Sequence, residues 1–143
     1  MTGCAFCQIV SGSLTADIVL RDEACLAFLD KRPLFPGHVL LIPRRHYQTL
    51  PEVPPEQAAA LMRNTQLLSR AVESALEAEG TFIAVNNRVS QSVPHVHVHV
   101  VPRRKKDGLK GFFWPRYKYQ GEEEMIRTRE AIVAALDPSP CTC

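Results

Sequence analysis

Three of the five histidines in this chain alternate with valines over residues 94–101, which read Pro-His-Val-His-Val-His-Val-Val. Alternate side chains of a strand point to opposite faces, so this spacing puts His95, His97 and His99 on one face and the valines in a core behind them. The outer two imidazoles would then lie about 13 Å apart. One metal ion could take two neighbours from this row, but a central nucleophilic imidazole flanked by two others suits the spacing better. The alternative is an edge strand that is merely polar, although histidine is not a favoured strand residue.

A second candidate for chemistry is the pair of thiols in Cys4-Ala-Phe-Cys7. A redox pair of the thioredoxin type needs a preceding strand, and there is no room for one. Two thiolates at this spacing form half of a zinc site and would need two further ligands. The alternative is two unremarkable thiols near a frayed terminus. The cysteine count is odd, and no secretory segment is apparent, so we expect reduced thiols or metal ligation rather than disulfides.

The elements that position these residues must come from a chain of 143 residues, which is a single-domain length. Its composition, 45% hydrophobic and 22% charged, is that of a globular protein rather than a disordered one. A net charge of +2 does not by itself indicate a nucleic-acid or membrane partner. No stretch is long and apolar enough for a transmembrane helix, and we expect a soluble, cytoplasmic protein.

Apolar and β-branched runs between turn residues predict five extended segments. They cover residues 17–23, 24–30, 38–43, 81–85 and 94–101. The first three are close together in the chain, which favours an antiparallel meander. Apolar residues at helical spacing predict a long helix over residues 54–79, followed by Gly80, and a second helix over 121–136.

Between the histidine segment and the second helix, residues 103–119 combine basic and aromatic side chains. Seven Lys and Arg residues fall within sixteen positions, against Asp107 alone. This segment could hold a polyphosphate or an anionic leaving group and stack a second base, or it could be a solvated basic loop beside a hydrophobic dimer contact. RNA binding is a weaker reading, because it rests only on the interleaving of basic and aromatic residues.

The histidine segment, preceded by Gln91-Ser92-Val93, resembles the signature of the histidine triad (HIT) family of nucleotide hydrolases and transferases. Residues 26–30, 35–38 and 42–46 resemble the upstream half of that family in order and spacing, so the similarity covers roughly residues 4–102. The resemblance implies an α+β fold with an antiparallel sheet and a homodimer. It also implies one histidine triad domain over residues 1–143, with a core at 4–102 and the basic segment and C-terminal helix at 103–137.

The same resemblance implies a purine nucleotide substrate, such as a dinucleoside polyphosphate or a nucleoside phosphoramidate, cleaved at the α-phosphate. His97 would attack phosphorus and form a nucleotidyl-histidine intermediate, and His99 would donate a hydrogen bond to a phosphate oxygen. Competing hypotheses are a nucleotide-binding regulator with little turnover and a metalloenzyme that uses the His-x-His pair as ligands.

Six further positions match substrate-binding positions of the family. They are Phe6 and Ile9 around the base, Asp30 on the ribose hydroxyls, and Asn86, Gln91 and Ser92 near the phosphate. Each has a plainer explanation. Asp30 could begin the turn before Pro33, the polar residues could solvate a loop, and the apolar pair could be ordinary core.

The family also offers a place for the two thiols. Cys4, Cys7, His46 and His95 match the ligands of a structural zinc ion in bacterial-type members, a closed tetrahedral set. His95 would then be a ligand rather than a proton carrier, and His38 would orient the other two histidines or only pack beside them. One departure concerns the loop before Gln91, which is short and has Ser90 where glycine is common. Because serine disfavours positive φ, we expect a different phosphate loop here, which puts the role of Asn86 in question.

Overall fold

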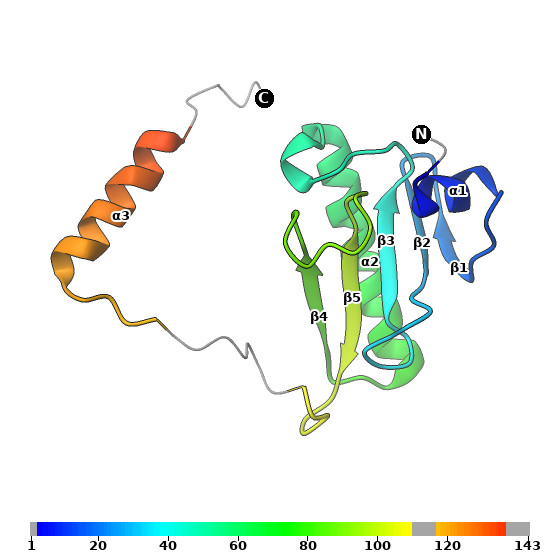
Figure 1. Ribbon diagram of the computed structural model, residues 1–143. Coiled ribbons are helices and arrows are strands. Elements are labelled where there is room, and N and C mark those ends of the chain that lie inside the picture. The colour runs from blue at the N-terminus through cyan, green and yellow to red at the C-terminus, as the bar shows by residue number, and fades with distance from the viewer. Residues whose placement is uncertain (1–2, 110–116, 137–143) are drawn as a thin grey trace. The chain divides into compact units, whose positions relative to one another are not determined.

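The computed structural model describes residues 3–109 and 117–136 and divides the chain into two compact units. The N-terminal unit comprises residues 1–108 and the C-terminal unit residues 109–143 (Figure 1). Within the described ranges, no helix is long and apolar enough to cross a membrane.

The N-terminal unit contains a five-stranded antiparallel sheet in the order β1-β2-β3-β5-β4. Its strands are β1 (Ile18–Arg21), β2 (Cys25–Leu29), β3 (Val39–Pro43), β4 (Gly80–Val85) and β5 (Val98–Arg103). The predicted α+β class is confirmed, and β1, β2 and β3 form the predicted meander. The meander does not continue, because β5 pairs with both β3 and β4 and separates them.

The two central strands are apolar along their whole length because both of their faces are covered. In β2, Cys25 and Ala27 pack in the core shared with the long helix α2, whereas Leu26 and Phe28 pack against the short helix α1. The neighbouring strand β3 divides its residues between the two clusters in the same alternating way. The register of the sheet therefore decides which side chains face α1, where the candidate site lies.

Helix α2 (Pro55–Leu76) covers one face of the sheet, as Figure 1 shows. It lies where the apolar spacing predicts a helix, with Pro55 in the first turn and Leu61, Leu68 and Val72 buried. It ends before the predicted boundary, because Glu77 takes a left-handed conformation at φ 51° and Gly80 already begins β4.

The sequence did not predict helix α1 (Ala5–Ser11), which begins directly after Cys4 and contains Cys7. Its seven residues are too few to show an amphipathic period. Phe6 and Ile9 are both 7% exposed and pack against Phe28 and Leu40 of the sheet. Tertiary packing, rather than helix propensity, stabilises so short a helix.

The histidine segment departs from the predicted strand, because β5 begins only at Val98. His95 and His97 precede it: the chain bends from Ser92 to His95, and Val96 and His97 belong to no helix or strand. The backbone N–H of His95 bonds to Val93 O, and that of Val96 bonds to Tyr47 O at 2.8 Å. The predicted alternation survives, since the valines pack toward α2. However, His95 is completely buried and His97 is 2% exposed, so these imidazoles lie inside the protein rather than on an open sheet face.

The C-terminal unit contains helix α3 (Glu122–Ala135), which agrees with the predicted second helix. Three glutamates in its first turn interact favourably with the helix dipole. The predicted apolar side of this helix is exposed within the unit, which the sequence did not indicate. Its residues are Met125, Ile126, Ile132, Val133 and Leu136. The aromatic centre of the basic segment, residues 112–114, lies outside the described residues, as do Cys141 and Cys143.

Candidate active site

The site begins as a row of side chains across the sheet. Phe28 pairs with Leu40, Leu40 pairs with His99, and His99 pairs with Ala84. Paired residues of antiparallel strands point to the same face. His99 therefore lies on the α1 side of the sheet, beside an apolar floor made by β2 and β3.

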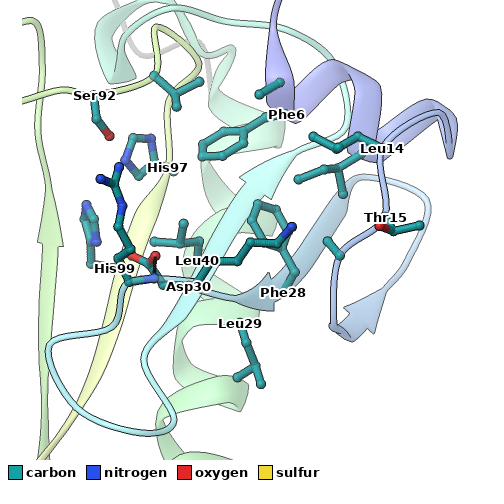
Figure 2. A pocket seen from close by; sticks show the side chains of 16 residues that line it. Phe6, Leu14, Thr15, Phe28, Leu29, Asp30, Leu40, Ser92, His97 and His99 are labelled. Atoms are coloured by element: carbon teal, nitrogen blue, oxygen red, sulfur yellow. Dashed lines mark hydrogen bonds between the residues drawn. The ribbon is translucent and has the colours of Figure 1, made fainter.

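A cavity of about 540 Å³ opens above this floor. Phe6, Ile9 and Phe28 line its apolar part, and Leu14 and Thr15 lie at its far side (Figure 2). A second group of lining residues is polar and lies together on the other side in Figure 2: Asp30, Ser92, His97 and His99. This volume is within the range of small-molecule sites, and the combination of apolar walls with a few polar groups is typical of them.

The hydrogen bond of His97 determines which of its nitrogens can react. His97 Nδ1 lies 2.8 Å from the backbone carbonyl of His95. A carbonyl can only accept, so Nδ1 carries the proton and Nε2 keeps its lone pair. The edge-on contact of Phe6, with ring centroids 5.2 Å apart and an interplanar angle of 89°, also restricts the ring. An imidazole held in this way can act as a nucleophile.

A backbone amide determines the tautomer of His99 through a second histidine. The N–H of Leu34 donates to His38 Nδ1 at 3.2 Å, so the proton of a neutral His38 is on Nε2. His38 Nε2 lies 2.9 Å from His99 Nδ1 and donates to it. The proton of His99 is consequently on Nε2, which makes that nitrogen a hydrogen-bond donor. Of the two roles expected for His38, orientation of the other histidines is the one that this geometry favours.

Burial keeps this pair of histidines neutral. Desolvation, together with the nearby His97 and His38, lowers the pKa of His99 to about 4. Desolvation also lowers the pKa of His38, although Asp30 opposes the change. The Asp30 carboxylate lies 3.7 Å from His38 Nδ1, but a neutral imidazole that already accepts a bond at that nitrogen does not form an ion pair with it.

Four potential metal ligands meet at the start of the histidine segment: Cys4, Cys7, His46 and His95. Their ligand atoms all lie within 4.8 Å of one another. The Sγ of Cys7 is 3.3 Å from His46 Nδ1, and the Sγ atoms of Cys4 and Cys7 are 3.5 and 3.6 Å from His95 Nδ1. Tetrahedral zinc with ordinary Zn–S and Zn–N bonds requires S···N separations of about 3.5 Å. The cluster therefore has the composition and the dimensions of a structural zinc site.

The buried ring of His95 is also oriented for a metal. Its Nε2 donates to Pro43 O at 2.9 Å, which leaves the Nδ1 lone pair directed at the thiols. Burial lowers the pKa of His95 to about 4 and raises that of the Cys7 thiol. A second cluster, of Asp30, His38 and His99, has ligand atoms equally close together. There the two imidazoles are already hydrogen-bonded to each other, so this cluster is the less suitable metal site. It contains only one histidine of the triad, so a metalloenzyme that uses the His-x-His pair stays a separate hypothesis.

Two of the predicted phosphate ligands do not line the cavity. Gln91 accepts from the backbone N–H of Arg88 and donates to Gln48 O at 2.7 Å, and Asn86 donates to Ser90 O. Both amides thus hold the loop itself, and their contact with substrate stays a prediction. Ser90 takes φ 59°, a conformation that glycine adopts more easily than serine, and the expectation of a different phosphate loop stays a prediction. The internal hydrogen bonds of the loop compensate for the strain.

Sequence reasoning missed two cations, Lys31 and Arg32, that line the cavity next to Asp30. Their position directly after the predicted ribose ligand was an available signal. In the basic segment, Arg103 forms an ion pair with Asp107 and Lys105 one with Glu79, so these two cations are engaged within the N-terminal unit.

A comparison with family models matches residues 11–106 to the HIT domain. That span includes two thirds of the chain and all three histidines of the segment. The chain therefore belongs to the histidine triad family.

Two relatives illustrate the activities of similar proteins. The chain is 38% identical over 108 residues to adenylylsulfatase HINT3 of Arabidopsis thaliana, a match that covers 74% of this chain but only 55% of that protein. It is 34% identical over 122 residues to adenosine 5'-monophosphoramidase hnt1 of Schizosaccharomyces pombe, covering 84% of this chain and 89% of that one.

Solved structures agree with the fold over nearly the whole chain. A HIT family protein from Bacillus subtilis superposes with a TM-score of 0.82 at 31% identity, covering 94% of this chain and 98% of that one. A zinc-bound histidine triad family protein from Mycobacterium smegmatis gives 0.73 at 38% identity, covering 97% and 99%. These similarities mark the chain as a bacterial-type HIT protein, and they support the zinc interpretation of the cluster.

Proposed function

We propose that this protein is a nucleotide hydrolase or nucleotidyl transferase that cleaves its substrate at the α-phosphate through a nucleotidyl-His97 intermediate. The observation that carries the proposal is the hydrogen bond from His97 Nδ1 to His95 O, which leaves Nε2 as a free base inside a ligand-sized cavity. The substrate is a purine nucleotide conjugate, either a dinucleoside polyphosphate or a nucleoside phosphoramidate. The activities of the two relatives, on an adenylyl sulfate and on an adenosine phosphoramidate as their names state, favour that class.

In the first step, His97 Nε2 attacks the α-phosphorus, and an N–P bond forms as the bond to the leaving group breaks. The leaving group departs with the electron pair of that bond. The carbonyl of His95 stabilises the positive charge that develops on the ring through the Nδ1 proton. The Nε2 proton of His99 and the hydroxyl of Ser92 donate to the phosphate oxygens and the leaving group.

In the second step, water attacks phosphorus, and the N–P bond breaks with its electron pair returning to His97 Nε2. The water proton passes to solvent, and a nucleoside monophosphate is released. If another nucleophile replaces water, the same intermediate gives nucleotidyl transfer. Both outcomes require His99 to remain a neutral donor, which its burial provides.

The remaining contacts orient the nucleotide. Phe6 and Ile9 sandwich the purine, and the Asp30 carboxylate accepts the ribose hydroxyls. Asn86 and Gln91 contribute by shaping the loop that presents Ser92, and an opening of that loop would let their amides reach the phosphate.

Zinc is the proposed structural ion of the Cys4, Cys7, His46 and His95 cluster. It would join α1 to the end of β3 and to the histidine segment, and it would take no part in bond cleavage. A chelator should therefore lower the melting temperature before it affects nucleotidylation, and Cys4→Ser should do the same. Purified protein that elemental analysis shows to be free of metal would count against the ion, provided that a chelator changes neither its turnover nor its melting temperature.

The proposal includes a homodimer built from whole chains, each of which is one histidine triad domain over residues 1–143. Strand β4 forms one edge of the sheet, and Ile83 on that strand is exposed. Met62 and Leu67 are exposed on α2. An exposed edge and apolar surface of this kind suit self-association. Light scattering during size-exclusion chromatography would measure the mass directly.

Turnover tests the function. Diadenosine polyphosphates and adenosine 5'-phosphoramidate should yield AMP, and His97→Ala should abolish that product while the chain stays folded. A His97→Ala variant that kept the wild-type rate would refute the mechanism. Tight nucleotide binding with negligible turnover across the panel would favour the nucleotide-binding regulator instead.

A further inference from the structure

The rim of the nucleotide cavity contains two positive charges that the proposed mechanism does not use. Lys31 and Arg32 follow the last residue of β2 by two and three positions and line the same cavity as His97 and His99. Both are exposed at the surface, so their charged ends can reach a ligand without a desolvation cost in the free protein.

These cations are not committed to a protein partner. Among the residues that the structure describes, neither forms an ion pair within 4.0 Å. Asp30 is the one acidic side chain among the described residues that line the cavity. Its Oδ1 already accepts the backbone N–H of Arg32 at 2.9 Å, and its Oδ2 faces His38. Two free cations against one acceptor give the rim a net positive charge.

The backbone holds this arrangement in place. The bond from the Arg32 N–H to the Asp30 carboxylate closes a tight turn, which keeps both cations next to the proposed ribose ligand. Asp30 N bonds to His38 O at 2.9 Å, so the same turn is joined to the residue whose side chain donates to His99. A guanidinium with free N–H groups can bind a phosphate with two parallel hydrogen bonds, and an ammonium adds a point charge.

We propose that Lys31 and Arg32 bind a second phosphate of the substrate, one that is separate from the phosphate attacked by His97. This inference rests on the proposed function, because it takes a nucleotide in the cavity as given. The second phosphate belongs either to the chain beyond the α-phosphate or to the ribose, since both lie within reach of residues adjacent to Asp30. The pair would make the enzyme selective for multiply phosphorylated nucleotides.

A different role for the same residues is apolar. The long aliphatic stems of Lys31 and Arg32 could cover the purine or the ribose while their charged ends stay in water. In that case the two residues would strengthen the binding of every adenine nucleotide equally, because all of them share the nucleoside. The number of phosphates therefore separates the two roles.

The test is a comparison of dissociation constants for AMP, ADP and adenosine 3',5'-bisphosphate with the full chain, measured by titration calorimetry and with nucleotide integrity checked afterwards. The variants are Lys31→Gln and Arg32→Gln, which keep most of the stem and remove the charge. Arg70→Gln is the matched control, because Arg70 is exposed on α2 and does not line the cavity.

Wild type should bind at least one of the two doubly phosphorylated ligands more tightly than AMP. Each variant should raise the dissociation constant of that ligand about fivefold to tenfold, as expected for a partly exposed charge-assisted contact. The dissociation constant of AMP should change less than about twofold. Arg70→Gln should change neither. An effect confined to ADP assigns the second phosphate to the chain, and one confined to the bisphosphate assigns it to the ribose.

Equal losses for AMP and for the doubly phosphorylated ligands would overturn the inference in favour of stem packing. A wild type without preference for a second phosphate would also overturn it. Either result would leave the proposed function intact as long as AMP binds and His97 is required for turnover. Failure of AMP itself to bind would instead contradict the proposed function.

Discussion

The histidines of the site differ in the position of their ring proton because the backbone groups that they contact differ: a carbonyl can only accept a hydrogen bond, and an amide N–H can only donate one. A carbonyl on His97 Nδ1 leaves a base at Nε2. An amide on His38 Nδ1 passes the donor role on to His99. The same two-residue spacing therefore gives one ring with a lone pair at Nε2 and one with a proton there, without any difference in residue type.

The chain from Leu34 through His38 to His99 predicts a kinetic effect of a residue that does not touch the substrate. His38→Ala should lower kcat by about tenfold or more with a smaller change in KM, because His99 would no longer be held as an Nε2 donor. His38→Gln should recover part of kcat, since its amide can donate to His99 Nδ1. Steady-state kinetics with one nucleotide substrate would measure both. A wild-type kcat in His38→Ala would mean that the chain is not needed.

The lowered pKa of His99 predicts how folding stability changes with pH. Above pH 6.5 the ring is neutral in both folded and unfolded protein. Between pH 6.5 and about 4 only the unfolded state takes up the proton, so the free energy of unfolding falls as the pH falls. At about 1.4 kcal/mol per pKa unit, and with a reduction for solvent screening of a ring that is only partly buried, the shift corresponds to roughly 1–3 kcal/mol.

Urea unfolding at pH 7.5 and 5.0 would test this effect, with the same metal content in wild type and His99→Asn. The wild type should lose more stability between the two pH values than the variant, because the variant lacks the imidazole that only the unfolded state protonates in this range. Parallel losses would show that His99 does not make the expected contribution.

At this scale the sequence predicted which residues gather at the cavity and in the metal cluster better than it predicted their tautomers. The spacing of His95, His97 and His99 indicated one nucleophilic ring with two companions, and the family resemblance grouped His95 with three other ligands. The alternatives for His38 stayed open because its tautomer depends on the Leu34 amide, which is a tertiary contact. Lys31 went unnoticed because an exposed lysine in a turn usually only solvates it.

The connection between β2 and β3 passes close to the end of α2 at Gly37. Gly37 has φ 94°, and a Cβ atom at this position would overlap Leu76 Cδ1. Gly12, at the end of α1, has a similar φ of 82° but nothing within 4 Å of such an atom. Both glycines therefore have a left-handed backbone conformation, but only Gly37 lacks room for a Cβ atom.

Gly37→Ala should therefore destabilise the protein by about 2–4 kcal/mol, and Gly12→Ala by about 1 kcal/mol. The first value combines the left-handed conformation with steric overlap, whereas the second contains the conformation alone. Chemical denaturation of both variants would give the two free energies of unfolding. Equal values would show that Leu76 moves aside at no cost.

Elements with a clear period were predictable, and those built by tertiary contacts were not. Helix α2 followed from apolar residues such as Leu61 and Leu68 at helical spacing. The position of β5 between β3 and β4 did not follow, because strand order depends on the path of the connecting helix rather than on local pattern. The early part of the histidine segment bends and is unpaired with β4, a distinction that alternation does not reveal.

On the scale of the whole molecule, the features of the proposed enzyme all fall in one of the two compact units. Residues 1–108 contain the sheet, both apolar clusters, the cavity and the four-residue metal cluster. The family match also ends at residue 106. The N-terminal unit therefore has the hydrophobic core that independent folding requires.

A chain that ends at Gly108 should thus unfold in a single cooperative transition and keep its far-ultraviolet circular dichroism per residue for the sheet and α2. Thermal melting followed by circular dichroism would measure this, with the full chain as the reference. A truncated chain without a cooperative transition would show that residues 109–143 are required for the fold.

The central claim is that His97 carries the nucleotidyl group during turnover. Protein quenched during turnover in denaturant at alkaline pH, where the N–P bond is stable, then digested and analysed by tandem mass spectrometry without acid treatment, should show a nucleotidyl group on His97 Nε2. The group should disappear once the substrate is exhausted and should be absent from His97→Ala. Active enzyme that carries no such group during turnover, or that carries it on another residue, would contradict the account.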